Sequence, residues 1–561
     1  MKNLLCLLLL AVSVTGFTQE SKLKGLVADI RSNLMEVESG DETYTQNLKL
    51  LNHSVLKYAL VEVDKKGNRE ELAYEFNLAD LDPYVVREET KRDIIHLSLT
   101  VKNEQDFIKY YEDGEVDGYE DSMLIVTKDI DNARALRELI KKAIPIAQEV
   151  MAAKLSVNTY SEMEKWLEQN VLDAENSKDA YNQKMVPLDD FPAHFKFIQT
   201  EISSKSSEEM QYLFNLADIN KNTMEFNISG SNFSLELETR KKQDLIQVFE
   251  NGVPDGFDDE LEIFANNVEE ARDLKNILTD AIPLAEEQIN SSIQKFDSQQ
   301  AVFANLSQLI KDIDYEDELV EQDINSSCKM RYTMVENDKK SSEKLTAEFN
   351  LIDINGNVID FDVSSDRMFV ELITKETLDM IKIYENDELD GFENELEIFA
   401  ANAEIARRIK YALKDAISIC ERDYKDPFVN MTLKQKITWL TKNMEEVRMD
   451  DETITQNFER IDQSDLDKIK LTKLIVDSKG GSEEIFEFNF TDLNPKSIQY
   501  DISRKELLVS FTTMFEEEII KYYEDGEIED YQEEFELIMP DIEKARQVIS
   551  VFNQIIAELS K

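Results

Sequence analysis

The chain has 561 residues and a formal charge of −54 at pH 7, from 63 Lys and Arg against 117 Asp and Glu. Apolar residues make up 42% and include 28 Phe and 19 Tyr, enough for packed cores, which excludes a disordered acidic chain. Such a charge repels nucleic acid and anionic lipid, so the composition favours a protein or a cationic surface as the partner.

The first twenty residues, "MKNLLCLLLLAVSVTGFTQE", are typical of a secretory signal. Lys2 is followed by an apolar run from Leu4 to Val14, too short to span a bilayer, and then by small and polar residues. We predict a signal peptide over residues 1–18, and its "FTQ" ending resembles the signals of proteins secreted by Bacteroidota. We therefore expect export, to the periplasm or the outside, without membrane insertion.

Two cysteines follow the predicted signal, Cys328 and Cys420. An exported chain permits a disulfide between them. Two buried thiols are the alternative, because free cysteine is among the most buried residue types. The sequence leaves both states open.

A short motif, Phe-Asn-Leu-x-Asp, recurs four times, with Phe490 in place of the leucine in the last instance. Its asparagines are Asn77, Asn215, Asn350 and Asn489. An Ala-Arg pair begins 56 residues after each asparagine, so the segments between them contain no insertions. These pairs are Ala133-Arg134, Ala271-Arg272, Ala406-Arg407 and Ala545-Arg546.

The constant spacing predicts four copies of one domain. Segments of ~135 residues can each bury a core, so we expect tandem domains and not a solenoid. We call them copy 1 (20–153), copy 2 (154–292), copy 3 (293–424) and copy 4 (425–561). Copies 1 and 4 share "DETYTQN" and "DETITQN", whereas copies 2 and 3 share "DGFDDELEIFA" and "DGFENELEIFA". Either two duplications made this pattern, or the inner and outer copies occupy different environments.

Copy 4 shows the predicted order of elements most clearly. An amphipathic helix is followed by alternating strands with a hairpin turn at "SKGG", and a long helix closes the copy. The predicted elements are a helix at 432–447, strands at 468–477, 483–493, 506–513, 517–523 and 534–540, and a helix at 542–559.

The closing helix has a capping residue in every copy: Asp129, Asn267, Asn402 and Asp541. We predict that the four helices begin within two residues of Ile130, Val268, Ala403 and Ile542. The acidic residue two positions after the cap suits a helix N-terminus. The alanine of the Ala-Arg pair should pack closely on a sheet. We expect the arginine to be solvated or paired with a nearby charge, and a ligand contact is the alternative.

The motif itself is interpreted as a turn that follows a strand. By the period of two, its Phe and Leu should point into a core and its Asn to the other side. The following Asp suits a turn with bonds from side chain to backbone. A ligand site shared by the copies is the alternative.

Six or seven short strands closed by one helix resemble the pleckstrin-homology-like fold, with an added helix at the start of each copy. The resemblance implies an α+β fold with a strongly bent antiparallel sheet; a cystatin-like or other α+β sheet is the alternative. Lipid-binding members of that family use a basic first hairpin. Here "DKKGNREE" (64–71) and its counterparts mix lysines with acidic residues, which argues against phosphoinositide binding.

An acidic segment starting 36 residues after each motif asparagine partly matches a calcium loop, which requires oxygen ligands at positions 1, 3, 5 and 12 and glycine at 6. Copy 3 matches best, and the other copies each lack one of these features. Its candidate ligands are Asn386, Glu388, Asp390 and Glu397, with Gly391 at the sixth position. An ordinary acidic β-turn is the alternative.

The sequence contains no phosphate-binding glycine loop, and no nucleophile and base recur together. The three histidines, His53, His96 and His194, share no offset between copies. We therefore expect an exported, non-enzymatic binding or scaffolding protein without a cofactor. The alternatives are a calcium-dependent acidic surface protein and an enzyme with an unrecognised carboxylate site.

Overall fold

The computed structural model describes residues 19–91, 93–154, 157, 159–175, 179–229, 232–315, 318–364, 367–448, 452–462, 464–478, 480–503 and 505–561. The predicted signal peptide lies outside these residues. The chain divides into two compact units, Met1–Ser292 and Ile293–Lys561. The first unit holds copies 1 and 2, and the second holds copies 3 and 4.

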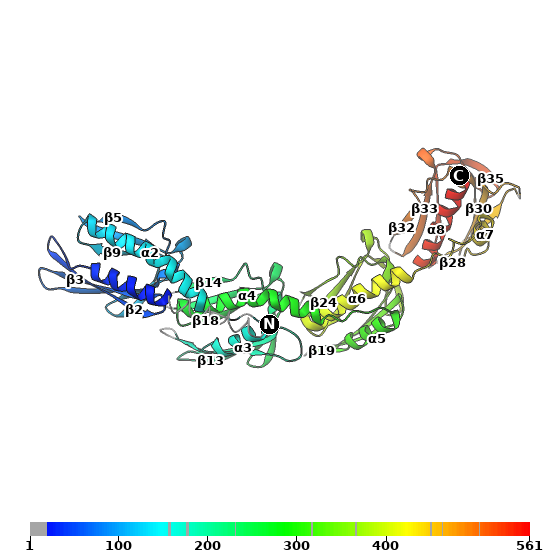
Figure 1. Cartoon of the computed structure of the whole chain (residues 1–561). Coiled ribbons are helices and arrows are strands. Elements are labelled where there is room, and N and C mark those ends of the chain that lie inside the picture. The colour runs from blue at the N-terminus through cyan, green and yellow to red at the C-terminus, as the bar shows by residue number, and fades with distance from the viewer. Residues whose placement is uncertain are drawn as a thin grey trace, which may run out of the picture. The chain divides into compact units, whose positions relative to one another are not determined.

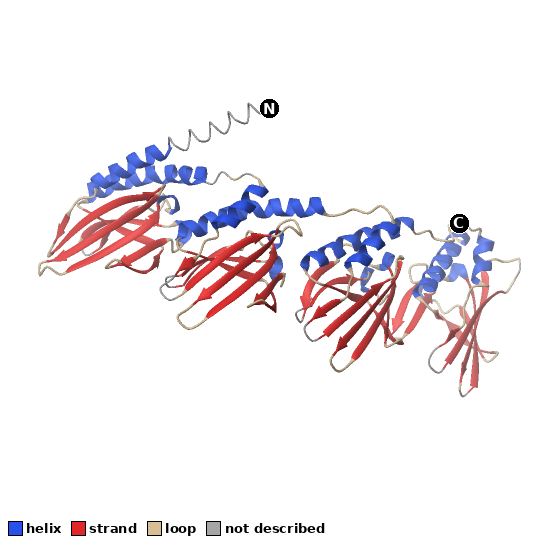
Figure 2. Cartoon of the chain, turned by 90° about the horizontal axis from the view of Figure 1, so that it is seen from below, coloured by secondary structure: helices blue, strands red, loops and turns tan. Residues whose placement is uncertain are grey.

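The fold is α+β, as predicted, and one arrangement recurs along the chain (Figure 1). Each copy has an antiparallel sheet of six strands, a second antiparallel sheet of three strands, a first helix and a closing helix. In Figure 2 the helices of each copy lie on one side of its strands. The prediction of six or seven strands in one bent sheet differs from this arrangement, because short, mostly exposed strands such as β35 (Glu527–Gln532) carry no alternating pattern.

In copy 1, residues 19–33 are helical, the larger sheet has the order β1-β2-β3-β4-β7-β8, and β5, β6 and β9 form the smaller one. Its elements are β1 (Val37–Ser39), β2 (Glu42–Asn52), β3 (Val55–Asp64), β4 (Arg69–Asn77), the 3-10 turn η1 (Leu78–Asp80), β5 (Arg87–Lys91), β6 (Ile94–Thr100), η2 (Lys102–Glu104), β7 (Ile108–Glu112), β8 (Glu115–Glu120), β9 (Ser122–Thr127) and α2 (Ile130–Lys154).

Copy 2 repeats this order with β10-β11-β12-β13-β16-β17 in the larger sheet and β14-β15-β18 in the smaller one. Its elements are α3 (Tyr160–Asn170), β10 (Ala174–Glu175), β11 (Ala180–Pro187), β12 (His194–Ile202), β13 (Ser207–Asn215), η3 (Leu216–Asp218), β14 (Glu225–Ser229), β15 (Asn232–Glu238), η4 (Arg240–Lys242), β16 (Ile246–Glu250), β17 (Val253–Asp258), β18 (Glu260–Ala265) and α4 (Val268–Ser292).

Copy 3 has β19-β20-β21-β22-β25-β26 and β23-β24-β27 as its two sheets. Its elements are α5 (Gln299–Leu309), β19 (Ile313–Tyr315), β20 (Glu318–Ile324), β21 (Lys329–Asp338), β22 (Ser342–Asn350), η5 (Leu351–Asp353), β23 (Asp360–Ser364), β24 (Arg367–Ile373), η6 (Lys375–Thr377), β25 (Ile381–Glu385), β26 (Glu388–Glu393), β27 (Glu395–Ala400) and α6 (Ala403–Asp423).

Copy 4 has β28-β29-β30-β31-β34-β35 and β32-β33-β36. Its elements are α7 (Leu433–Leu440), β28 (Val447–Arg448), β29 (Glu452–Arg460), β30 (Lys468–Asp477), β31 (Gly480–Asn489), η7 (Phe490–Asp492), β32 (Gln499–Ser503), β33 (Glu506–Thr512), η8 (Met514–Glu516), β34 (Ile520–Glu524), β35, β36 (Glu534–Ile538) and α8 (Ile542–Leu559). The first helix is shorter than predicted, because the chain leaves it after Leu440 and forms β28 at Val447.

The closing helices begin at Ile130, Val268, Ala403 and Ile542, which confirms the prediction from their caps. Each capping side chain accepts a hydrogen bond from the backbone three residues on; in copies 3 and 4 the N···O distances are 3.0 Å at Asn402 and 2.7 Å at Asp541. The predicted close packing of the alanine is also confirmed. Ala133, Ala271, Ala406 and Ala545 are all fully buried.

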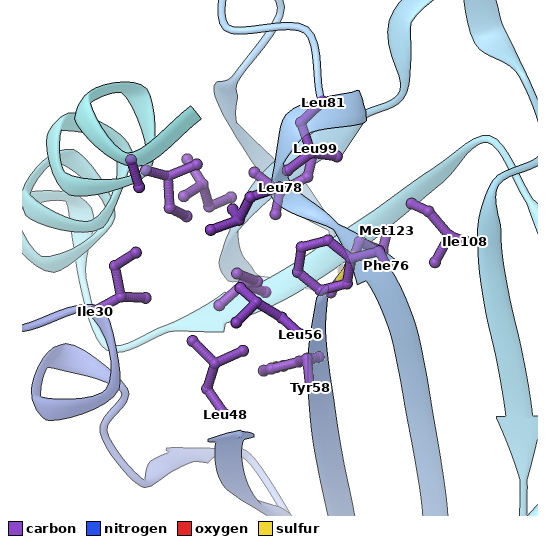
Figure 3. Packing of buried hydrophobic residues seen from close by; sticks show 14 of the residues in the cluster. Ile30, Leu48, Leu56, Tyr58, Phe76, Leu78, Leu81, Leu99, Ile108 and Met123 are labelled. Atoms are coloured by element: carbon purple, nitrogen blue, oxygen red, sulfur yellow. The ribbon is translucent and has the colours of Figure 1, made fainter. Parts of the chain in front are cut away.

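The core of each copy lies between its helices and its sheets. Figure 3 shows this for copy 1, where Ile30 of the first helix, Leu48 of β2, Leu56 of β3 and Phe76 of β4 point toward one another. The first and closing helices pack side by side in copies 2, 3 and 4. Burial of this kind stabilises by about 25 cal/mol per Å² of apolar surface, so an independent core is expected in each copy.

A buried glutamine joins the two sheets in three of the copies. Gln456 on β29 donates to the carbonyl of Ile538 on β36 at 2.6 Å and accepts from its N–H at 3.0 Å. Gln183 bonds Phe264 and Gln322 bonds Phe399 in the same two ways. A buried amide group needs hydrogen-bond partners. Here the glutamine side chain of the larger sheet bonds a backbone N–H and C=O of the smaller sheet and so links the two sheets.

The two cysteines form a disulfide. Cys328 precedes β21 and Cys420 lies on α6, 92 residues apart in sequence, with Cα atoms separated by 5.7 Å. The bond ties the strand region of copy 3 to its closing helix.

Candidate functional site: the contact between successive copies

The motif forms a capped 3-10 turn, as its composition predicted. Asn77 precedes η1, and its Oδ1 accepts from the backbone N–H of Ala79 at 2.9 Å and from the Ser54 hydroxyl at 2.6 Å. Phe76 and Leu78 are buried in the core. Asn215 and Asn350 cap their turns in the same way. The turn therefore places the asparagine amide and the aspartate carboxylate at one end of the copy.

That end of copy 1 contacts the start of the closing helix of copy 2. The Asn77 amide donates to both carboxylate oxygens of Glu269 at 3.0 Å. Arg272 lies between two carboxylates: it pairs with Asp80 of copy 1 and, at 2.8 Å, with Glu269 of its own helix. We call these four side chains the latch of the first unit.

The second unit has the same latch between copies 3 and 4. The Asn350 amide donates to Glu543 at 2.6 Å, and Arg546 pairs with both Asp353 and Glu543. Lys329 also lies 3.5 Å from Glu543. The side chains of Arg272 and Arg546 are each only 14% exposed. The local pairing expected for these arginines is confirmed, because each pairs with the glutamate three residues earlier on its own helix, but the second carboxylate in the preceding copy was not predicted.

Apolar side chains surround each latch. In the first unit, Phe107 of copy 1 meets Phe226 of copy 2 edge to face, with ring centroids 5.1 Å apart. Tyr119 lies 5.5 Å from Phe233, and the Arg272 guanidinium lies 5.5 Å from the Phe107 ring. In the second unit, Met380 and Phe392 of copy 3 belong to the buried cluster of copy 4. The contact is thus a small packed core with a charged centre, able to hold two copies in one orientation.

Burial, together with the excess of carboxylates over guanidinium groups, shifts the pKa of the motif aspartate at each latch. One guanidinium faces two carboxylates in a nearly dry site, so two negative charges are poorly neutralised. Burial raises the pKa of Asp80 to about 7, and the Arg272 charge only partly offsets this effect, while Glu269 adds to it. Burial also raises the pKa of Asp353. Burial acts to raise the pKa of Glu543 too, but its bonds with Asn350 and Arg546 outweigh that effect and lower it.

The raised pKa predicts that docking of copies 1 and 2 weakens as pH rises. The docked state keeps a proton on Asp80 that the separated state, with an ordinary carboxyl pKa of 3.8, has released. The stabilisation is therefore complete below about pH 4 and is lost as pH passes about 7. Between pH 5.5 and 8.0 we expect a loss of about 2 kcal/mol in the wild type relative to Asp80→Asn, measured by urea unfolding of the first unit. Parallel curves for the two proteins would contradict this.

The latch residues at the helix start of copy 1 and at the motif of copy 4 pair within their own copy. Arg134 of copy 1 is 60% exposed and lies 3.6 Å from Asp131 of its own helix, which confirms the local pairing expected for this arginine. At the other end, the Asn489 amide of copy 4 donates to Asp492 of its own turn at 2.8 Å. The same residue types thus bind the neighbouring copy inside a unit, whereas at Arg134 and Asn489 they bind within their own copy.

The candidate calcium ligands lie on strands and a hairpin turn. Asn386 is in the turn between β25 and β26, Glu388 and Asp390 lie on β26, and Glu397 lies on β27 of the smaller sheet. Asp390 is the extra residue of a β-bulge, because Ile383 pairs with Gly391 and Tyr384 with Leu389. Among the residues that the structure describes, no three His, Cys, Asp or Glu side chains are grouped as a metal would need.

Asn386 has a structural partner of its own. Its Oδ1 accepts from the backbone N–H of Lys344 at 3.2 Å, and its φ of 49° suits the turn that Asn or Asp occupies in every copy. We expect Asn386→Ala to lower the stability of the second unit by about 1–2 kcal/mol, because alanine loses the bond and is strained at positive φ. Thermal unfolding with and without calcium tests this, and a loss seen only with calcium would point to a metal ligand instead.

Other candidate chemistry is not gathered at the latches. His194 Nδ1 lies 2.9 Å from Asp190, and His96 Nδ1 lies 3.1 Å from the carbonyl of Ile94. A hollow of about 880 Å³ between copies 3 and 4 is lined by charges of both signs, among them Lys382, Arg448, Glu388 and Glu452. Within the described part of the chain, no helix is long and apolar enough to cross a membrane.

The sequence carries a signal for the latch in addition to the motif. An acidic residue and an arginine recur 54 and 57 residues after each motif asparagine, and the motif supplies an amide and a carboxylate at fixed positions. The amide can donate to the acidic residue, and the carboxylate can pair with the arginine. Nothing in the sequence of one copy indicates that these partners belong to different copies. Searches against protein-family models and against characterised proteins find no match to this chain.

Proposed function

We propose that this chain is an exported, non-enzymatic scaffolding protein of four homologous domains, docked through latches, that presents binding surfaces to another protein or to a cationic surface. The main observation behind the proposal is that the repeated motif binds the next copy within each unit. Its amide and carboxylate, the residues that a shared ligand site would need, are bound by the following copy in both units.

Two further observations support parts of the proposal. The disulfide between Cys328 and Cys420 suits an oxidising compartment, as expected of an exported chain. The net charge of −54 favours cationic partners over nucleic acid. We also propose that each copy is a variant of the pleckstrin-homology-like fold. The closing helix that follows the last strand supports this, and the division of the strands into two sheets is a departure from it.

The test combines export, capture and binding. The protein secreted by its source cells is expected to start within a few residues of Gln19, and to retain a partner when captured from envelope and medium fractions. The purified partner should bind with fixed stoichiometry in calorimetry. A double variant, Arg272→Ala with Arg546→Ala, should weaken this binding, whereas Arg134→Ala should not. Cytoplasmic retention, or turnover of a substrate that is lost when a carboxylate is replaced, would overturn the proposal.

A further inference from the structure

Copy 4 exposes the apolar part of the surface that the latch contact covers in copies 1 and 3, and its Asn489 and Asp492 are half-buried. The residue 30 positions after the motif asparagine is Phe107 in copy 1 and Met380 in copy 3, and these are 7% and 5% exposed. The equivalent residue of copy 4, Ile519, is 40% exposed. The residue 42 positions after the asparagine is Phe392 in copy 3, 8% exposed, and Tyr531 in copy 4, 50% exposed.

We call Asn489, Asp492, Ile519 and Tyr531 the terminal face of copy 4. In copies 1 and 3 the equivalent face is covered by the start of the closing helix of the next copy. Among the described residues of the second unit, none covers Ile519 and Tyr531 in this way. The face thus continues an interface established twice in this chain, and it has an amide, a carboxylate and two apolar side chains to offer.

Copy 1 carries the complementary surface, also exposed. Its closing helix begins with Ile130, Asp131 and Arg134, at the positions of Val268, Glu269 and Arg272 in copy 2. Ile130 is 38% exposed against 7% for Val268. The side chains of Asp131 and Arg134 are 89% and 60% exposed, whereas those of Glu269 and Arg272 are 19% and 14% exposed.

We propose that the terminal face of copy 4 binds the helix start of copy 1 of a second molecule, so that chains associate head to tail. In this contact Arg134 pairs with Asp492, Asp131 accepts from the Asn489 amide, and Ile130 packs on Ile519 and Tyr531. A contact between two different surfaces of one chain leaves each end free to continue, which gives filaments or rings and not closed dimers of twofold symmetry.

Three features make this contact weaker than the internal latches. Copy 1 has Glu88 where copy 2 has the interface aromatic Phe226, and Arg137 holds that carboxylate at 2.8 Å. The internal contacts are also favoured by the tether between copies, which raises the effective concentration to about the millimolar range. Finally, two chains of −54 charge repel each other. Association should therefore strengthen as salt shortens the Debye length to about 10 Å at 0.1 M.

Sedimentation velocity of the full exported chain, over a concentration series at 0.15 M salt, tests the proposal. The wild type is expected to form oligomers with rising concentration. Arg134→Asp or Asp492→Arg places like charges together and should weaken association about tenfold or more. Mixing the two variants should restore association as alternating chains, because each junction in the mixture again joins opposite charges at positions 134 and 492. Lys205→Asp and Glu343→Arg, which replace exposed residues that belong to neither face, are the matched charge controls.

Thermal unfolding of each variant shows whether the fold is kept. Because Asp492 also accepts bonds within its own turn, Tyr531→Ser provides a second variant of the terminal face, expected to weaken association by several fold without lowering stability. Restored association in the mixture establishes the head-to-tail contact. A wild type that stays monomeric at all concentrations, or folded charge variants that associate as strongly as the controls, would overturn the proposal.

Discussion

Replacing Arg272 by alanine is expected to lower the free energy of unfolding of the first unit by about 3–5 kcal/mol at pH 8, the usual cost of removing one partner from a buried ion pair. The side chain is 14% exposed and pairs with both Asp80 and Glu269. Without the guanidinium, the carboxylates of Asp80 and Glu269 lie close together in a site with little exposure to water. Because burial has already raised the pKa of Asp80 to about 7, part of the cost should disappear at pH 5.5, where that carboxyl takes up a proton.

The chain supplies a matched control in Arg134, the equivalent arginine of copy 1. Its side chain is 60% exposed and pairs only with Asp131 of its own helix. Arg134→Ala should therefore change stability by no more than about 0.5 kcal/mol. Urea unfolding gives the two values, and hydrogen exchange at η1 and at the start of α4 localises the effect. Equal losses in the two variants would show that the latch does not stabilise docking.

The second large effect is expected on reducing the disulfide of the second unit. The bond joins Cys328 to Cys420, which are 92 residues apart in the sequence, and so closes a long loop. In the chain-entropy model a loop of this length corresponds to about 4–5 kcal/mol. Reduction, or the double variant Cys328→Ser with Cys420→Ser, should lower the melting temperature of the second unit accordingly, measured by calorimetry.

The first unit is the internal reference for that experiment, because the sequence places no cysteine in it after the predicted signal. Its transition should keep its position on addition of a reducing agent. Expression in a reducing compartment should lower the melting temperature of the second unit in the wild type. It should not lower it further in the double variant, which has no disulfide to lose. If both transitions moved together, the two units would unfold cooperatively and the disulfide would not act locally.

Features governed by neighbours along the chain were predictable from the sequence. The closing helices start where Asp or Asn can accept an orphan backbone N–H, and this local bond fixes Ile130, Val268, Ala403 and Ile542 as first residues. The turn at the motif follows from the same chemistry at Asn77. The four-fold recurrence is itself a property of the sequence, since it needs only constant spacing.

Tertiary structure alone decided which residues those local elements bring together. Arg272 and Arg134 occupy the same place in the same helix, yet one is buried against the preceding copy and the other is exposed. No local propensity distinguishes them, because the difference comes from a neighbour 192 residues away in sequence. Likewise, Gln456 looks like an ordinary polar strand residue until folding buries its amide at the junction of two sheets. Helix caps act through bonds within one turn of chain, whereas burial and charge pairing depend on surfaces that exist only after folding.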